Sequence, residues 1–123
     1  MMKNQTLIIT KANEFIAQLN SLLSEYPKEC DLSFIDLLND SATDYKTFIF
    51  NDYAKTFNFK YDDLKFKIRA FLSLFDNGKD YLLLFDKYES IHFEAMKYSE
   101  KIENFKYVLS LLIEQNNLLI AFN

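Results

Sequence analysis

The chain has 123 residues, of which 50% are hydrophobic and 17% aromatic, and this composition excludes intrinsic disorder. Its net charge of −4 and its pI near 4.9 argue against a protein that binds duplex DNA by neutralising phosphates. One Gly and one Pro are too few for the many tight turns of a sandwich or a barrel. The length and composition therefore predict one domain, residues 1–123, built from long helices.

The compartment is predicted from features that the sequence lacks. A single cysteine cannot form an internal disulfide, which is typical of a reducing compartment. The first fifteen residues contain no charged, apolar and small-residue regions in the order of a signal peptide. Glu114, Asn116 and Asn117 interrupt the apolar run near the C-terminus, so it is too short to span a membrane. We expect a cytoplasmic protein without membrane contact.

The first predicted helix has an apolar residue at alternating steps of four and three. Such a stripe is typical of a helix that packs along one face. It ends before Pro27, which lacks the N–H that a continuing helix needs. A short helix over 32–38 and a break over 39–43 are expected to follow. The stripe consists of Ile8, Ala12, Phe15, Leu19, Leu22 and Tyr26.

The next segment allows two interpretations. Helical spacing predicts one helix over about 42–57 and a second that begins near Asp62 or Asp63 as its N-cap and ends at Gly78 as its C-cap. The alternation of apolar and polar residues fits a small antiparallel meander over residues 46–86, with a hairpin turn at 76–78. The two helical stripes would be Tyr45, Ile49, Tyr53 and Phe57, followed by Tyr61, Leu64, Ile68, Phe71 and Phe75.

The C-terminal third favours the helical interpretation. From Tyr81 to Leu119 the same spacing continues over twelve positions, with Asn116 as the polar exception and no Gly or Pro. We expect two helices here, with a break near 97–104, because helices in compact domains average about a dozen residues. The predicted fold class is therefore all-α: a compact helical bundle with a long C-terminal helical region. The α+β meander is the alternative.

Few residues are suited to catalysis or metal binding. Glu89 and His92 match the E-x-x-H spacing of helical di-iron sites, but such sites need two of these motifs and the chain has one His. No Gly-rich phosphate loop, nucleophile elbow or Cys/His cluster is present. We therefore expect no enzyme, no cofactor and no metal.

Lysines and aromatic residues alternate between Phe59 and Arg69, as in proteins that stack single-stranded bases. Asp62 and Asp63, however, stand three and four residues before Lys65 and Lys67, the spacing of ion pairs within a helix. Together with the negative net charge, this spacing predicts no nucleic-acid binding.

An acidic segment is the candidate interface. Nine acids and four lysines lie between Glu25 and Asp63, whereas the rest of the chain has nine acids and ten bases. Four aspartates in this segment are spaced by multiples of four residues; helix capping is an alternative explanation for Asp40 or Asp44. Carboxylates beside aromatic anchors are typical of a surface that binds a basic protein. The predicted interface residues are Asp36, Asp40, Asp44, Tyr45, Phe48, Asp52 and Tyr53, and Phe59 is a further aromatic residue outside the core stripe.

These properties predict a small acidic protein, monomer or homodimer, that inhibits a basic protein partner. Immunity or antitoxin proteins that block bacterial toxins such as nucleases have this physical character, and so do phage-encoded inhibitors of host nucleases; no motif assigns the chain to a family of either. The alternative is a helical chaperone or adaptor that holds an amphipathic client segment.

Overall fold

The computed structural model describes residues 4–25, 43–91 and 97–122, with the side chains of all of these except 43–55. The helices are α1 (Gln5–Ser24), α3 (Thr43–Leu72), α4 (Gly78–Ser90) and α5 (Tyr98–Ala121), and the described residues contain no strand. The prediction of an all-α helical bundle is confirmed. The alternative meander over 46–86 is wrong, because α3 and α4 occupy that range.

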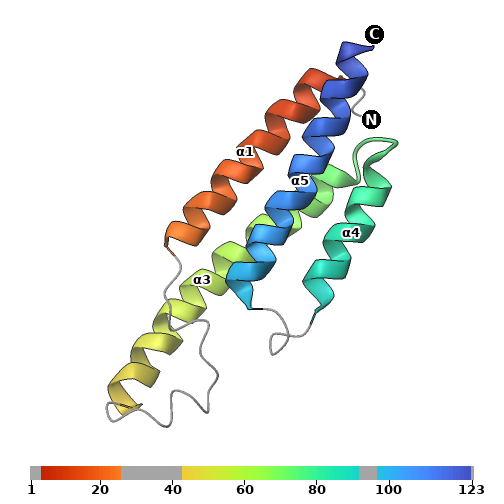
Figure 1. Cartoon of the computed structure of the whole chain (residues 1–123). Coiled ribbons are helices and arrows are strands. Elements are labelled where there is room, and N and C mark those ends of the chain that lie inside the picture. The colour runs from red at the N-terminus through yellow and green to blue at the C-terminus, as the bar shows by residue number, and fades with distance from the viewer. Residues whose placement is uncertain (1–3, 26–42, 92–96, 123) are drawn as a thin grey trace.

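The helices form a bundle in which neighbours run antiparallel (Figure 1). Helix α1 packs against α5 and α3, and α4 packs against the same two helices. The α1–α5 contact is the most extensive. This is an up-down arrangement of neighbouring helices. In Figure 1 the N-terminal part of α3, in yellow, extends past the ends of the other helices.

Helix α1 forms as its sequence pattern predicts. The side-chain oxygen of Asn4 accepts a hydrogen bond from the Leu7 N–H at 3.2 Å and so caps the first turn. Five of the six predicted stripe residues are buried, and the sixth, Tyr26, lies outside the described residues. The predicted short helix over 32–38 and the break after it lie outside them as well, apart from Thr43.

Helix α3 is one continuous helix of 30 residues, about 45 Å long, and not the two that were expected. No Gly or Pro interrupts it, and the two predicted stripes join at Phe57 and Tyr61, which are both buried. Asp62 and Asp63 therefore lie in the middle of a helix, so the prediction that one of them is an N-cap is wrong. The ion pairs predicted from their spacing are present: Lys65 Nζ lies 3.4 Å from Asp62, and Lys67 Nζ 2.9 Å from Asp63.

A tight corner over residues 73–77 connects α3 to α4. Gly78 was predicted as the C-cap of a helix, but it begins α4 and does not have a positive φ. A Cβ atom at this position would lie 2.0 Å from the main-chain oxygen of Leu72. The glycine is therefore required because the start of α4 comes so close to the last turn of α3.

The C-terminal region contains two helices, as predicted: α4 ends at Ser90 and α5 begins at Tyr98, so the break lies at the N-terminal edge of the predicted position near 97–104. The buried centre of α4 is Phe85, which stacks on Phe105 with the ring centroids 4.2 Å apart. The predicted stripe residues Tyr81 and Tyr88 are only half-buried beside it. Leu119 is 38% exposed because the end of α5 projects beyond the other helices (Figure 1).

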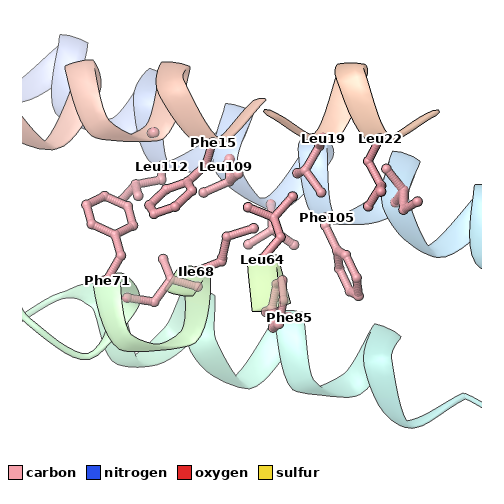
Figure 2. Close-up of a cluster of buried hydrophobic side chains, with 14 of the residues drawn as sticks. Phe15, Leu19, Leu22, Leu64, Ile68, Phe71, Phe85, Phe105, Leu109 and Leu112 are labelled. Carbon is pink, nitrogen blue, oxygen red and sulfur yellow. The ribbon is translucent and has the colours of Figure 1, made fainter. Parts of the chain in front are cut away.

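The four helices share one hydrophobic core. Figure 2 shows side chains of α1 pointing towards those of α3 and α5, with Phe85 of α4 closing the core from the other side. Asn116, the polar exception in the predicted stripe, is 1% exposed, and its Nδ2 donates to the Leu112 carbonyl at 2.9 Å. The labelled residues are Phe15, Leu19, Leu22, Leu64, Ile68, Phe71, Phe85, Phe105, Leu109 and Leu112.

The Gly78→Ala substitution is expected to destabilise the fold by about 1–3 kcal/mol, because main-chain atoms must move to admit the Cβ. Urea unfolding followed by circular dichroism should show a lower midpoint with an unchanged slope. Lys79→Ala is the matched control, since that side chain is exposed on the same turn. Equal midpoints for the two variants would show that the main chain around Gly78 admits the Cβ without loss of stability, and would contradict the prediction.

Candidate partner-binding face

The predicted interface residues fall into two groups. Asp36 and Asp40 lie outside the described residues. The other five, Asp44, Tyr45, Phe48, Asp52 and Tyr53, lie on the first three turns of α3. Helical spacing places Asp44, Phe48 and Asp52 above one another on one line of the helix. The predicted interface remains a prediction, and α3 provides the helix that would carry most of it.

Because α3 is continuous, the line through Phe48 and Asp52 extends along the whole helix at steps of three and four residues. In the described part it passes through Phe59, Asp63, Phe66, Ala70 and Leu74, where Leu74 follows the last helical turn. We call these five residues the outer stripe. Phe59 is 77% exposed and Phe66 is 72% exposed, values that are unusual for phenylalanine in a folded domain. Phe59 was expected to lie outside the core.

Phe66 was not among the predicted interface residues, although its exposure makes it a candidate. In the sequence it stands in the alternating segment 64–70, where it was considered as part of a strand or a base-stacking pattern. The helical stripe through Leu64 and Ile68 already excludes position 66 from the buried face. This helical spacing was therefore the sequence signal from which the exposure of Phe66 could have been predicted.

A shallow groove between α1 and α3 runs beside the outer stripe. It has two hollows, of about 260 Å³ and about 460 Å³, and Gln18 of α1 borders both. Phe59 and Asp63 border the first hollow; Phe66, Ala70 and Leu74 border the second. An apolar groove between two helices, with aromatic side chains at its edge, is suited to receive a side chain or a helix of another protein.

The charges along this groove are balanced. Lys60 of α3 reaches across to Glu25, the C-cap of α1, at 2.6 Å, and Lys67 pairs with Asp63 at 2.9 Å. All four side chains are about half exposed, so each pair contributes little to stability. The acidic excess of the sequence is therefore not located in the described groove. It lies mainly in the preceding segment and the first turns of α3.

The basic residues that resembled a base-stacking pattern are all engaged with carboxylates. Besides the pairs already described, Lys65 Nζ lies 2.9 Å from Glu89, and Arg69 donates two hydrogen bonds to Asp86 at 2.7 and 2.9 Å. These last two pairs connect α3 to α4. The hydrogen bonds and the charge of Asp86 raise the pKa of Arg69. The expectation that the chain does not bind nucleic acid remains a prediction.

A second group of polar residues lies where α3, α4 and the start of α5 meet. Lys101 of α5 is 7% exposed and its Nζ donates to the Glu89 carbonyl at 2.8 Å, which caps the end of α4. Burial lowers the pKa of Lys101, the Glu89 charge opposes this effect, and the nearby Lys65 ammonium adds to it. Burial would also lower the pKa of Lys65, but the hydrogen bond and charge of Glu89 raise it. These contacts explain the group as a structural connection between helices.

Glu89 is thus explained without a metal. Helix α4 ends at Ser90, so the helical spacing on which an E-x-x-H site depends does not extend to His92, which lies outside the described residues. No group of three or more His, Cys, Asp or Glu side chains in the described part of the chain is placed to hold a metal ion. Among the same residues, no helix is long and apolar enough to cross a membrane.

Tyr61 is the buried neighbour of this group. Its hydroxyl has no hydrogen-bond partner among the described residues, and its ring lies 5.3 Å from Lys65 Nζ. Its ring also contacts Tyr98 and Phe105, with centroids 5.2 and 6.1 Å away. Burial, and then the negative charge of Glu89, raises the pKa of Tyr61 above its ordinary value.

The Tyr61→Phe variant is expected to be at least as stable as the wild type at pH 7, because it removes a buried hydroxyl without a partner. Since the folded state raises the pKa of Tyr61, the unfolded state ionises first, and stability is lost as the pH rises above about 10. The Tyr61→Phe variant should therefore lose less stability over this pH range than the wild type. Urea unfolding at pH 7 and at about pH 11 measures this, with Tyr107→Phe as the exposed control. Equal alkaline losses in both variants would contradict the assignment.

Comparisons with known proteins give no relative for this chain. No protein-family model matches it, and searches of curated proteins and of solved structures find no match.

Proposed function

We propose that the protein is a cytoplasmic protein-binding inhibitor of the immunity or antitoxin type, which blocks a basic toxin such as a nuclease and has no catalytic activity of its own. The observation that carries the proposal is the continuity of α3. One helix connects the acidic positions Asp44 and Asp52 with aromatic residues that stand out from the surface, of which Phe59 is the nearest described example.

In the proposed mechanism, charge attracts the partner and apolar contacts hold the complex together. A nuclease that binds phosphates carries a basic cleft, and the acidic segment before and within the first turns of α3 would attract that cleft over a distance. Aromatic side chains of α3 would then provide the short-range contacts that hold the complex. A protein bound in this way would exclude the nucleic acid from the cleft. A phage-encoded inhibitor of a host nuclease would use the same chemistry.

The second candidate is a helical chaperone or adaptor, and the groove between α1 and α3 favours it. The two hollows lie in line beside Phe59 and Phe66, which are seven residues apart and so two helical turns. A client helix with apolar residues at the same spacing would match this arrangement. The inhibitor would need a basic partner, whereas the adaptor would depend on apolar contact and little on charge.

A growth assay tests the inhibitor function. The C-terminal domain of the protein encoded by the neighbouring upstream reading frame is expressed in bacterial cells with and without this chain. Rescue of growth by the chain, together with a stable complex of the two purified proteins, would support inhibition. A neighbour that is neither basic nor toxic, or a toxic one that the chain does not neutralise, would contradict it.

The first prediction on mechanism concerns the charge of four aspartates: Asp36, Asp40, Asp44 and Asp52. Their replacement by Asn is expected to slow association with the basic partner and to flatten its dependence on salt, because charge acts mainly on encounter. Asn also caps helices nearly as well as Asp, so the fold should be kept. Binding kinetics at two salt concentrations measure the effect. Unchanged association rates at both concentrations would remove these residues from the interface.

The second prediction on mechanism concerns the aromatic side chain of Phe48. Phe48→Ala is expected to speed dissociation, with a loss of about 1–4 kcal/mol of binding free energy if the ring is an anchor, and to leave the association rate nearly unchanged. Leu83→Ala on α4 is a matched control, since Leu83 is an exposed apolar side chain on a different helix. Similar dissociation rates for the two variants would contradict an anchoring role for Phe48.

A further inference from the structure

The outer stripe of α3 contains both a projecting side chain and a hollow of matching character. Phe59 projects near one end of the described stripe, where it is 77% exposed. The hollow of about 460 Å³ lies at the other end, bordered by Phe66, Ala70 and Leu74 of this stripe and by Phe15 of α1. Ala70 leaves this hollow open because its side chain is short. A ring and a hollow that each lack a partner in the described residues are present on one face.

We propose that this face is the interface of a homodimer, in which α3 pairs with α3 of a second copy in the antiparallel direction. A dimer with twofold symmetry places the same surface on both copies, so the surface must be complementary to itself. With the axis beside Phe66, Phe59 lies about two turns before the axis. The position between Ala70 and Leu74 lies about two turns after it. Phe59 of each copy therefore enters the hollow of the other, as a knob enters a hole.

The charges on and beside the stripe match an axis in this position. The midpoint between Asp63 of the stripe and the neighbouring Lys67 is position 65, next to Phe66, so an antiparallel pair centred there places each Asp63 opposite Lys67 of the other copy. Within one chain these two side chains already pair at 2.9 Å, and both are more than half exposed, so they are free to turn towards the second copy. Asp63 of the stripe and the adjacent Lys67 are one acid and one base, so this pairing joins opposite charges.

The homodimer buries Phe59, which would then serve the dimer and not the basic partner, and leaves the acidic first turns of α3, with Phe48, accessible. The first turns of α3, with Asp44 and Asp52, precede Phe59 and lie away from the axis, towards the end of α3 that projects from the bundle (Figure 1). An antiparallel pair would direct the two acidic ends in opposite directions, and each copy could hold one partner. The homodimer does not depend on the inhibitor function, since it is measured on this chain alone.

Sedimentation of the purified chain over a range of concentrations is the direct test. The wild type is expected to approach twice its mass of 14.6 kDa as the concentration rises. Phe66→Glu should raise the dissociation constant at least about 30-fold, because it places two carboxylates at the axis. Leu83→Glu on α4 is the matched control and should leave the dimer intact. A wild type that stays monomeric up to about 1 mM, or equal effects of both glutamates, would overturn the proposal.

An exchange of charge tests the antiparallel register without removing an aromatic ring. Asp63→Lys alone opposes lysine to lysine across the axis, and Lys67→Asp alone opposes aspartate to aspartate, so each variant should dimerise about 10-fold more weakly than the wild type. A mixture of the two variants restores opposite charges at both contacts and should form a mixed dimer. Circular dichroism of each variant checks that the bundle is kept. A mixture that associates no better than its components would overturn the register.

Discussion

Helix α3 can bury only one of its faces, and the rest of the structure depends on that limit. Its inner face packs against α1 and α4 through residues such as Tyr61, Leu64 and Ile68. The segment from Phe48 to Phe66 carries more aromatic rings than this face can cover, so Phe59 and Phe66 remain in contact with solvent. An apolar stripe on a helix that already has its core partners is a surface at which association with another chain lowers the free energy.

The helix ends are held by specific polar contacts that a pattern of apolar residues does not provide. Lys101 caps α4 through the carbonyl of Glu89, and the carboxylate of the same Glu89 binds Lys65 of α3. One residue therefore connects three helices at one end of the bundle. At the opposite end, Gly78 allows α4 to start directly against the last turn of α3. These two contacts set where the short helix α4 lies, and hence where Phe85 meets Phe105 in the core.

The candidate functional surface and the polar group are on different sides of α3. The ion pairs of Lys65 and Arg69 face α4, whereas the outer stripe with Phe59 and Phe66 lies beside α1. This separation explains how a helix rich in both lysine and aromatic residues avoids presenting a basic, ring-lined surface to nucleic acid. Lys65 and Arg69 are neutralised on the α4 side, and Lys60 and Lys67, which lie beside the rings, are paired with Glu25 and Asp63.

Much of the fold was determined by the sequence itself. The steps of three and four residues identified the buried face of α1 and most of the buried residues of α3 and of α5, because burial of one helical face requires that spacing. Val108 and Lys101 of α5 are buried but were outside the predicted stripe. The near absence of Gly and Pro indicated long helices for the same reason that α3 runs on without a break: nothing in its sequence ends a helix. The exposure of Phe59 and the ion pairs of Asp62 and Asp63 with lysines also followed from helical spacing alone.

Other features depended on contacts between residues distant in sequence. Periodicity did not indicate that Gly78 starts a helix, because the reason is the carbonyl of Leu72 that approaches it in space. Periodicity placed Tyr81 and Tyr88 on the inner face of α4, whereas the position of Phe105 on α5 made Phe85 the buried centre. The groove beside Phe66 exists only because α1 lies next to α3. A sequence pattern states which face of a helix is apolar, and only the packing of the helices decides which part of that face stays uncovered.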